Sequence, residues 1–306
     1  MAVIYRIVFF AVSALLAIQC QAASLALMGG AGGYSFPGPE EYIKVGERFE
    51  LAWGKGSPLL YACRPQSLTV SRYGVEPAWG LGTGLVLKEP CYQCELIALD
   101  KNAHSIDFHL EPGTHYFRLG KNGGTFCGEV APQRASSQWL QVAVRAGDDY
   151  LGLLQELRGT PFLVFPEETE FGNQADLRVG ADCAALAIYG RRRLGFNVPY
   201  GGPRGIVKYL SPLDNRLLIP GSRGYHYEGS NQLVHISSLG LKPGDILHSG
   251  EQVSVFYKAQ GASGILNQED LVFQAQPGGP AISTLRENGY YPSALKAYRW
   301  KEAGIP

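Results

Sequence analysis

The chain has 306 residues, and its 27 basic and 27 acidic side chains give a formal net charge of zero. With no long run of Lys and Arg, this balance gives no reason to expect a nucleic-acid partner. A chain of this length is longer than a typical domain with a single hydrophobic core, and it is long enough to form two domains. The 39 glycines and 19 prolines are typical of a chain with many short strands and tight turns.

Residues 1–22 are predicted to form a secretory signal peptide. Arg6 precedes an apolar run at residues 7–18, and Cys20-Gln21-Ala22 places small residues at the usual cleavage offsets. The run is shorter than the roughly 20 residues that a membrane-spanning helix requires. We therefore expect a periplasmic or secreted protein with no stable membrane span after cleavage.

Five cysteines follow the predicted signal: Cys63, Cys91, Cys94, Cys127 and Cys183. The first four are expected to form two disulfides, by any of three connectivities, in an oxidising compartment. Four thiolates also match a zinc site in number, but outside the cytosol oxidation is favoured, so no metal or cofactor is expected. Cys183 is then an unpaired thiol and a candidate reactive group.

Residues 23–38 are rich in glycine and are predicted to be a flexible lead-in. Residues 39–146 carry short alternating segments between turn residues, which predict an antiparallel β-sandwich-like domain. The predicted strands lie at 42–45, 48–53, 67–70, 95–99, 105–110 and 139–144. This domain shows no catalytic constellation.

The second domain is predicted at residues 147–306. Asp148 or Asp149 can cap a helix over residues 150–158, with Gly159 ending it.

A second helix is predicted to begin at Cys183 and to end near Arg193. The Asp182 carboxylate is a good N-cap, because it accepts free amide hydrogens of the first turn. The helix dipole and those amides would favour the Cys183 thiolate and lower its pKa, as a nucleophile needs. The alternative is a buried structural thiol, since free cysteine is among the most buried residue types.

Further along the chain, two apolar runs flank Ser249-Gly250-Glu251, which predicts a β-hairpin with glycine in its loop. A third strand is predicted at residues 270–275.

Four motifs follow one another over roughly residues 150–285: Gly159-Thr160-Pro161-Phe162, Asp182-Cys183-Ala184-Ala185-Leu186, Pro243-Gly244-Asp245 and Gln252-Val253-Ser254-Val255-Phe256-Tyr257. In this order and spacing the segment resembles the NlpC family of papain-like cysteine peptidases, which cleave peptide bonds in peptidoglycan stems. The resemblance implies an α+β domain in which a helix bearing the cysteine packs on an antiparallel sheet. It makes Cys183 the nucleophile and Asp182 a ligand of the substrate's amino group. Phe162 stands where the family has a substrate-contacting Tyr.

The same resemblance exposes departures at the catalytic positions. Gln252 occupies the place of the family's general-base histidine, and the third polar position falls on Gln274. Glutamine has no titratable nitrogen, so Gln252 cannot take the thiol proton. If the hairpin loop has three residues, His248 faces Gln252 at about 5 Å and can replace the base, with Gln252 or Gln274 orienting it. The alternative for His248 is a strand-end histidine in water or against the helix.

Two functions remain open. The first, our working prediction, is an exported cysteine peptidase or amidase in which the Cys183 thiolate attacks an amide carbonyl of a peptidoglycan stem peptide. The second is a degenerate NlpC-like module that binds cell-wall peptide or a protein partner without cleaving it. The Asp182-Cys183 pair favours the first, whereas Gln252, Phe162 and the alanines after Cys183 favour the second.

Overall fold

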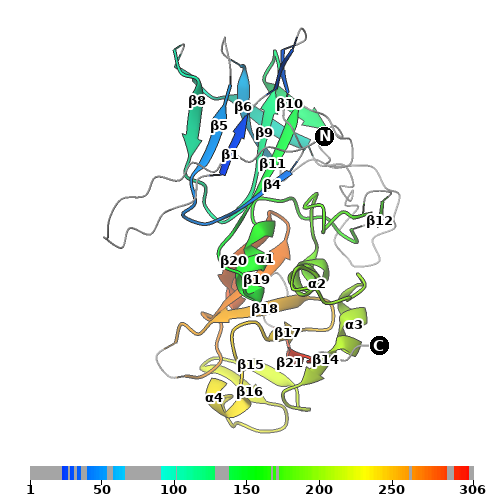
Figure 1. The fold of residues 1–306 in the computed structure, drawn as a ribbon. Coiled ribbons are helices and arrows are strands. Elements are labelled where there is room, and N and C mark those ends of the chain that lie inside the picture. Colours follow the sequence, from blue (N-terminus) through cyan, green and yellow to red (C-terminus); the bar gives the residue numbers. More distant parts are fainter. Residues whose placement is uncertain are drawn as a thin grey trace, which may run out of the picture.

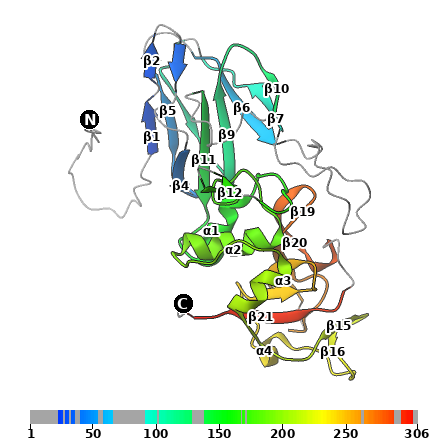
Figure 2. The same cartoon turned by 90° about the vertical axis from the view of Figure 1, so that its right-hand side faces the viewer.

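The computed structural model describes residues 23–26, 28–30, 33–35, 40–53, 58–65, 91–100, 102–127, 138–166, 168–169, 172–261, 264–287 and 293–302. The predicted signal peptide and the predicted strand at 67–70 lie outside these residues. The fold is α+β, with many strands and few helices, arranged in two lobes that Figures 1 and 2 show one above the other. Within the described residues no helix is both long and apolar enough to cross a membrane.

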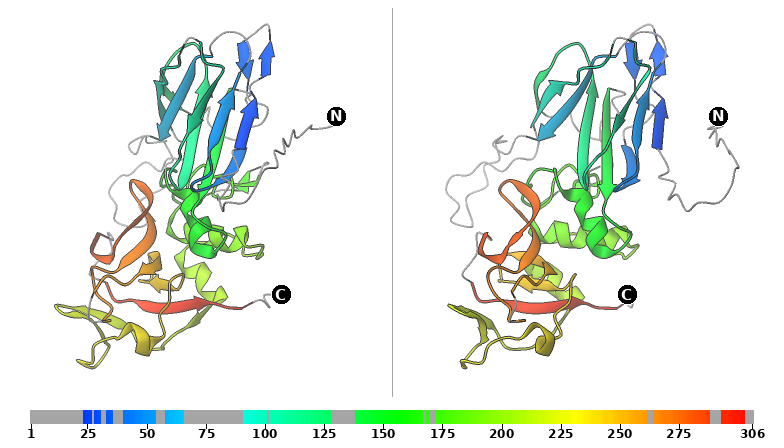
Figure 3. Two further views of the ribbon diagram at one scale, coloured as in Figure 1. Left: turned by 60° about the vertical axis from the view of Figure 1, so that its left-hand side comes forward. Right: turned by 90° about the vertical axis from the view of Figure 1, so that its left-hand side faces the viewer.

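The N-terminal lobe consists of two sheets and a small hairpin. One sheet has the order β1 (Ala23–Ala26), β5 (Phe49–Ala52), β8 (Ser105–Phe108). The other has the order β10 (Gly124–Cys127), β7 (Cys91–Leu96), β6 (Leu60–Pro65), β9 (Gly113–Leu119), β11 (Trp139–Arg145), β4 (Glu40–Lys44). The hairpin pairs β2 (Met28–Gly30) with β3 (Gly33–Ser35). Side chains of both sheets share one core, in which the Phe49 and Phe117 rings lie 6.1 Å apart. This is a sandwich-like arrangement, seen from two further sides in Figure 3.

The segment predicted as a flexible lead-in contains strands, so that prediction was wrong. β1 pairs in parallel with β5, with Leu25 opposite Leu51, and Leu25 packs against the shared core. Four residues are too few to show an alternating pattern, and the partner strand lies more than twenty residues away. The backbone of β5, not the local sequence, determines this strand.

One of the expected disulfides is present, between Cys63 on β6 and Cys94 on β7. The two residues are register partners on adjacent antiparallel strands, where side chains lie closest. Cys91 and Cys127 are likewise register partners, on β7 and β10. Their side chains lie outside the described residues. A disulfide is compatible with an oxidising, extracytoplasmic environment.

The C-terminal lobe is built on one six-stranded antiparallel sheet. Its order is β14 (Leu210–Pro212), β21 (Lys296–Trp300), β17 (Ile246–His248), β18 (Val253–Lys258), β19 (Leu271–Gln276), β20 (Gly279–Thr284). Its helices are α1 (Tyr150–Leu154), α2 (Cys183–Arg193), α3 (Pro203–Ile206) and α4 (Ile236–Leu239). Short 3₁₀ turns lie at Gln155–Leu157, Val207–Tyr209 and Leu285–Glu287, and small hairpins pair β12 (Glu168–Thr169) with β13 (Gly172–Asn173) and β15 (Leu218–Gly221) with β16 (Gly224–Tyr227).

Helix α2 packs on the face of this sheet that β18 and β19 form. Its buried side chains share a core with Val253 and Val255 of β18 and with Phe273 of β19. Leu247, Phe256 and Val272 belong to a second core. Because successive strand residues point to opposite faces, the two cores lie on the two faces of the sheet.

The first helix of this lobe is shorter than predicted. Asp149 is its cap, since the Asp149 carboxylate accepts the Gly152 N–H at 2.7 Å. The α-helix ends at Leu154 and tightens into a 3₁₀ turn, followed by Gly159 at φ +79°. A side chain on Gly159 would also come within 2.8 Å of the Thr114 carbonyl oxygen, so glycine is required there on both counts.

The two lobes are joined by buried polar contacts. The Tyr116 hydroxyl and the Gln141 amide both donate to the Arg178 carbonyl oxygen, at 2.9 and 3.2 Å. The Thr114 hydroxyl donates to the Glu156 carbonyl oxygen. Within the C-terminal lobe, the wholly buried Glu156 carboxylate accepts from the Tyr189 hydroxyl and pairs with Arg193 at 3.0 Å, which joins the 3₁₀ turn to α2 beneath the sandwich (Figure 1).

The Glu156→Gln substitution tests the buried ion pair between the 3₁₀ turn and α2. Gln keeps the volume but removes the charge that Arg193 faces, so we expect a loss of about 2 kcal/mol in the free energy of unfolding, measured by urea denaturation. Glu269→Gln is the matched control, because the Glu269–Arg286 pair is exposed on both sides and should change stability by less than about 1 kcal/mol. An equal loss of unfolding free energy in the two variants would show that the buried Glu156–Arg193 pair stabilises the fold no more than the exposed Glu269–Arg286 pair does.

Candidate functional site

Asp182 and Cys183 begin α2, as predicted. The Asp182 carboxylate is the N-cap: one oxygen accepts the Ala185 N–H at 2.7 Å, and the other accepts the Phe165 N–H at 3.0 Å. Burial raises the pKa of Asp182, while these backbone hydrogen bonds oppose the rise. Both carboxylate oxygens are therefore used to fix the start of α2 against the loop at residues 163–165.

The chemical state of the Cys183 thiol differs from the expectation. Cys183 is free but only 6% exposed. Burial, and next the Asp182 carboxylate, raise its pKa to about 12, although backbone N–H groups of Val253, Ala184 and Cys183 itself favour the thiolate. The predicted lowering of the pKa at the helix start is thus outweighed by desolvation. At neutral pH this shift favours the protonated thiol.

His248 is engaged elsewhere. Its Nε2 donates to the Pro203 carbonyl oxygen at 2.8 Å, and its Nδ1 accepts the Gly250 N–H at 2.9 Å. This pattern fits a neutral ring with its proton on Nε2. The imidazole also packs edge-on to the Tyr298 ring. Both ring nitrogens are hydrogen-bonded to backbone groups. His248 therefore fits the role of a strand-end histidine better than that of a base for Cys183.

The hairpin register explains part of this outcome. His248 pairs with Val253, not with Gln252, so the predicted three-residue loop was wrong. Ser249 and Gln252 continue the ladder, with the Ser249 N–H donating to the Gln252 carbonyl oxygen at 3.0 Å. The turn therefore has two residues, Gly250 and Glu251, and Gly250 takes φ +89°.

Gln252 directly precedes Val253, whose backbone N–H approaches the Cys183 sulfur. Its own side chain is buried, and its Nε2 donates to the Ala275 carbonyl oxygen at 3.3 Å. It thus closes the gap between the ends of β18 and β19. A glutamine can do this because its amide donates without titrating.

Gln274 lies on the wrong face of the sheet to act with Cys183. Its neighbours Phe273 and Ala275 belong to the α2 core, so the alternation of β19 turns Gln274 away. There its amide accepts from the Ser254 hydroxyl at 3.2 Å and donates to the Ser283 hydroxyl at 2.7 Å. The predicted orienting role for Gln274 was therefore wrong.

The other motifs have structural roles that the contacts make clear. Phe162 forms a parallel bridge with Ala181 and packs half-buried against the Cys183 core, which positions the start of α2. The Asp245 carboxylate accepts the Lys242 N–H at 2.7 Å. It also accepts two hydrogen bonds from the Arg299 guanidinium, at 2.8 and 2.7 Å, which connect the start of β17 to β21. Gly244, at φ +94°, lets this turn approach Tyr150.

One residue that sequence reasoning missed stands at the edge of this site. Phe165 is 51% exposed, takes φ +53°, and lends its N–H to Asp182. A positive φ at a bulky residue is uncommon and costs energy. The preceding turn signals marked a loop there, but no local pattern distinguished Phe165.

Comparisons with known proteins give little help. No protein-family model matches the chain, and no curated protein matches it. A multicopper oxidase structure is 16% identical over 41% of this chain and 42% of its own, with a TM-score of 0.19. A blue copper oxidase from Nitrosomonas europaea is 11% identical over 40% and 38%, with a TM-score of 0.18. The chain spans about two fifths of the length of each of these two proteins. Within the described residues no cluster of three or more His, Cys, Asp and Glu side chains is placed to hold a metal ion.

The state of the thiol can be measured by alkylation. In the native protein we expect Cys183 to resist an iodoacetamide-type reagent at neutral pH, and to react readily once the chain is denatured. Asp182→Asn should keep a capping side chain but remove the neighbouring charge, so alkylation of that variant should begin at lower pH than in the wild type. Rapid labelling of the native wild type at mildly acidic pH would contradict the buried, protonated thiol.

The raised pKa of Cys183 also predicts a pH dependence of stability. The unfolded thiol ionises near pH 9.0 and the folded one near 12, so the folded state is destabilised as pH rises between these values. Relative to Cys183→Ser, the wild type should lose about 2 kcal/mol of unfolding free energy between about pH 8.5 and about pH 10.5. The difference between the two proteins cancels the contribution of the tyrosines. Parallel stability curves would refute the shift.

Proposed function

We propose that the chain is an exported two-domain protein whose C-terminal lobe is an NlpC-like, papain-type module that binds cell-wall peptide without cleaving it. The resemblance in motif order supplies the fold family and the ligand class. The lobe's arrangement, a helix opening on Asp182-Cys183 and packed on an antiparallel sheet, is consistent with that family.

One observation carries the choice of binding over catalysis: the Cys183 sulfur is buried, and among the described residues no imidazole hydrogen-bonds to it. Acyl transfer by cysteine requires a thiolate or a base within hydrogen-bond reach. Here burial raises the pKa of the thiol, and the His248 ring is held by Pro203 and Gly250. The residues that replace the family's catalytic set, Gln252 and Gln274, stabilise the sheet instead.

A second function, a cysteine peptidase or amidase, is favoured by a different observation. Three backbone N–H groups approach the Cys183 sulfur at the start of α2, and such groups favour a thiolate. A rearrangement that brings water and a base to this sulfur would convert the site. The first function leaves the bound peptide intact, whereas the second cleaves one of its amide bonds.

Purified peptidoglycan sacculi discriminate between them. The full-length exported protein and its Cys183→Ala variant are each incubated with sacculi, and both co-sedimentation and released fragments are measured. The proposal expects equal co-sedimentation of the two proteins and no release by either. Release that disappears in Cys183→Ala would establish the peptidase, and failure of both proteins to sediment would reject cell-wall binding.

A further inference from the structure

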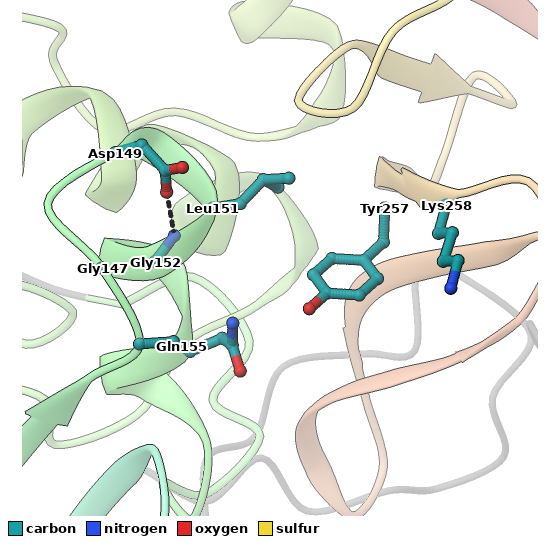
Figure 4. Close-up of a pocket in the computed structure, with 8 residues that line it drawn as sticks. Gly147, Asp149, Leu151, Gly152, Gln155, Tyr257 and Lys258 are labelled. Atoms are coloured by element: carbon teal, nitrogen blue, oxygen red, sulfur yellow. Dashed lines mark hydrogen bonds between the residues drawn. The ribbon is translucent and has the colours of Figure 1, made fainter. Parts of the chain in front are cut away.

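A hollow of about 390 Å³ lies between α1 and the end of β18, away from Cys183. Its walls come from the interlobe link, from α1 and its 3₁₀ turn, and from the last residues of β18 (Figure 4). The volume suits a small ligand. Lys258, at one end of the hollow, lies about 17 Å along β18 from Val253, whose N–H contacts the thiol, and Cys183 is not among the residues that line the hollow.

Gln155 is the first reason to regard this hollow as a binding site. Its side chain is only 7% exposed and points into the hollow. Among the described residues, no protein group hydrogen-bonds to its amide, whereas its carbonyl oxygen on the main chain accepts from Arg158. The Gln155 amide therefore faces the hollow, where water or a ligand can donate to its oxygen and accept from its nitrogen.

A β-bulge supplies a second, independent reason. The register between β18 and β19 shifts between Phe256 and Lys258, so Tyr257 is the extra residue without a strand partner. Bulges re-aim side chains, and they are frequent beside functional sites. Here the bulge directs the Tyr257 hydroxyl toward the gap that faces Leu151 and Gln155 (Figure 4).

The lining also limits the chemistry of the ligand. Gln155 offers a donor and an acceptor in one plane, which match the C=O and N–H of a peptide bond. Leu151 and the Tyr257 ring provide apolar surface for a small side chain. Lys258 is exposed at the rim and, within the described part of the chain, makes no ion pair, so it is available to a carboxylate. Asp149 is already occupied as the cap of α1.

We propose that this hollow binds a short peptide through a backbone amide and a free terminal carboxylate, with Gln155 and Tyr257 contacting the amide and Lys258 the carboxylate. The site gives the proposed wall-binding function a location and a selectivity, and in that sense rests on it.

Calorimetric titration of the full-length exported protein with N-acetyl-alanyl-alanine, and with the same dipeptide amidated at its C-terminus, tests the proposal. The wild type should bind the free acid more tightly than the amide. Gln155→Leu should weaken binding of both about tenfold. Lys258→Met should remove the preference for the free acid. Lys121→Met, which deletes an exposed lysine of the other lobe, is the matched control and should change nothing.

Gln155→Glu serves as a second variant in case Gln155→Leu folds poorly, because its charge should repel the free acid more than the amide. Urea denaturation checks each fold. The proposal is overturned if the wild type binds neither dipeptide, if the pocket variants bind like the wild type, or if a chitin oligosaccharide binds in preference. Sacculi distinguish the two levels: unaltered co-sedimentation of Gln155→Leu would reject this hollow alone. Dipeptide binding without co-sedimentation would reject the wall-binding function alone.

Discussion

The C-terminal lobe depends on one carboxylate. Asp182 fixes the start of α2 by accepting the N–H groups of Ala185 and Phe165, and it therefore also fixes where the Cys183 sulfur lies. The same charge stands beside that sulfur and acts with burial to keep it protonated. A cap that stabilises the helix thus disfavours the thiolate that a peptidase would need. The two effects cannot be separated while Asp182 is ionised.

Side-chain amides complete the hydrogen bonding of the sheet beneath α2. Gln252 bridges β18 and β19, and Gln274 joins serines on neighbouring strands at the far face. Neutral amides meet buried hydrogen-bonding needs without the cost of burying a charge. In this lobe Gln252 and Gln274 therefore have structural roles. Hydrogen bonds from Thr114 and Tyr116 to the carbonyl oxygens of Glu156 and Arg178 hold this lobe against the sandwich.

Local chemistry made much of this predictable from the sequence. The N-cap at Asp182, the helix to Arg193 and the strand that follows residue 270 depend on neighbouring residues, and the structure contains all three. The face of the sheet that Gln274 occupies was not predictable from the sequence. The alternation of side chains along a strand assigns residues to two faces, but it does not tell which face α2 covers. The strand at Ala23–Ala26 depends on a distant partner. The pKa of Cys183 depends on desolvation, which only the packed structure determines.

The central claim is that the Cys183 thiol stays protonated in the folded protein. Its ionisation can be followed directly by NMR, through the Cβ chemical shift of isotope-labelled cysteine across a pH titration of the native protein, with Cys183→Ser assigning the signal. The signal that disappears in Cys183→Ser belongs to Cys183, and Cys63 and Cys94 do not titrate because they form a disulfide. The account predicts a shift that remains at its thiol value through neutral pH and changes only far above the 9.0 of an ordinary thiol. A thiolate shift already present at neutral pH would contradict it.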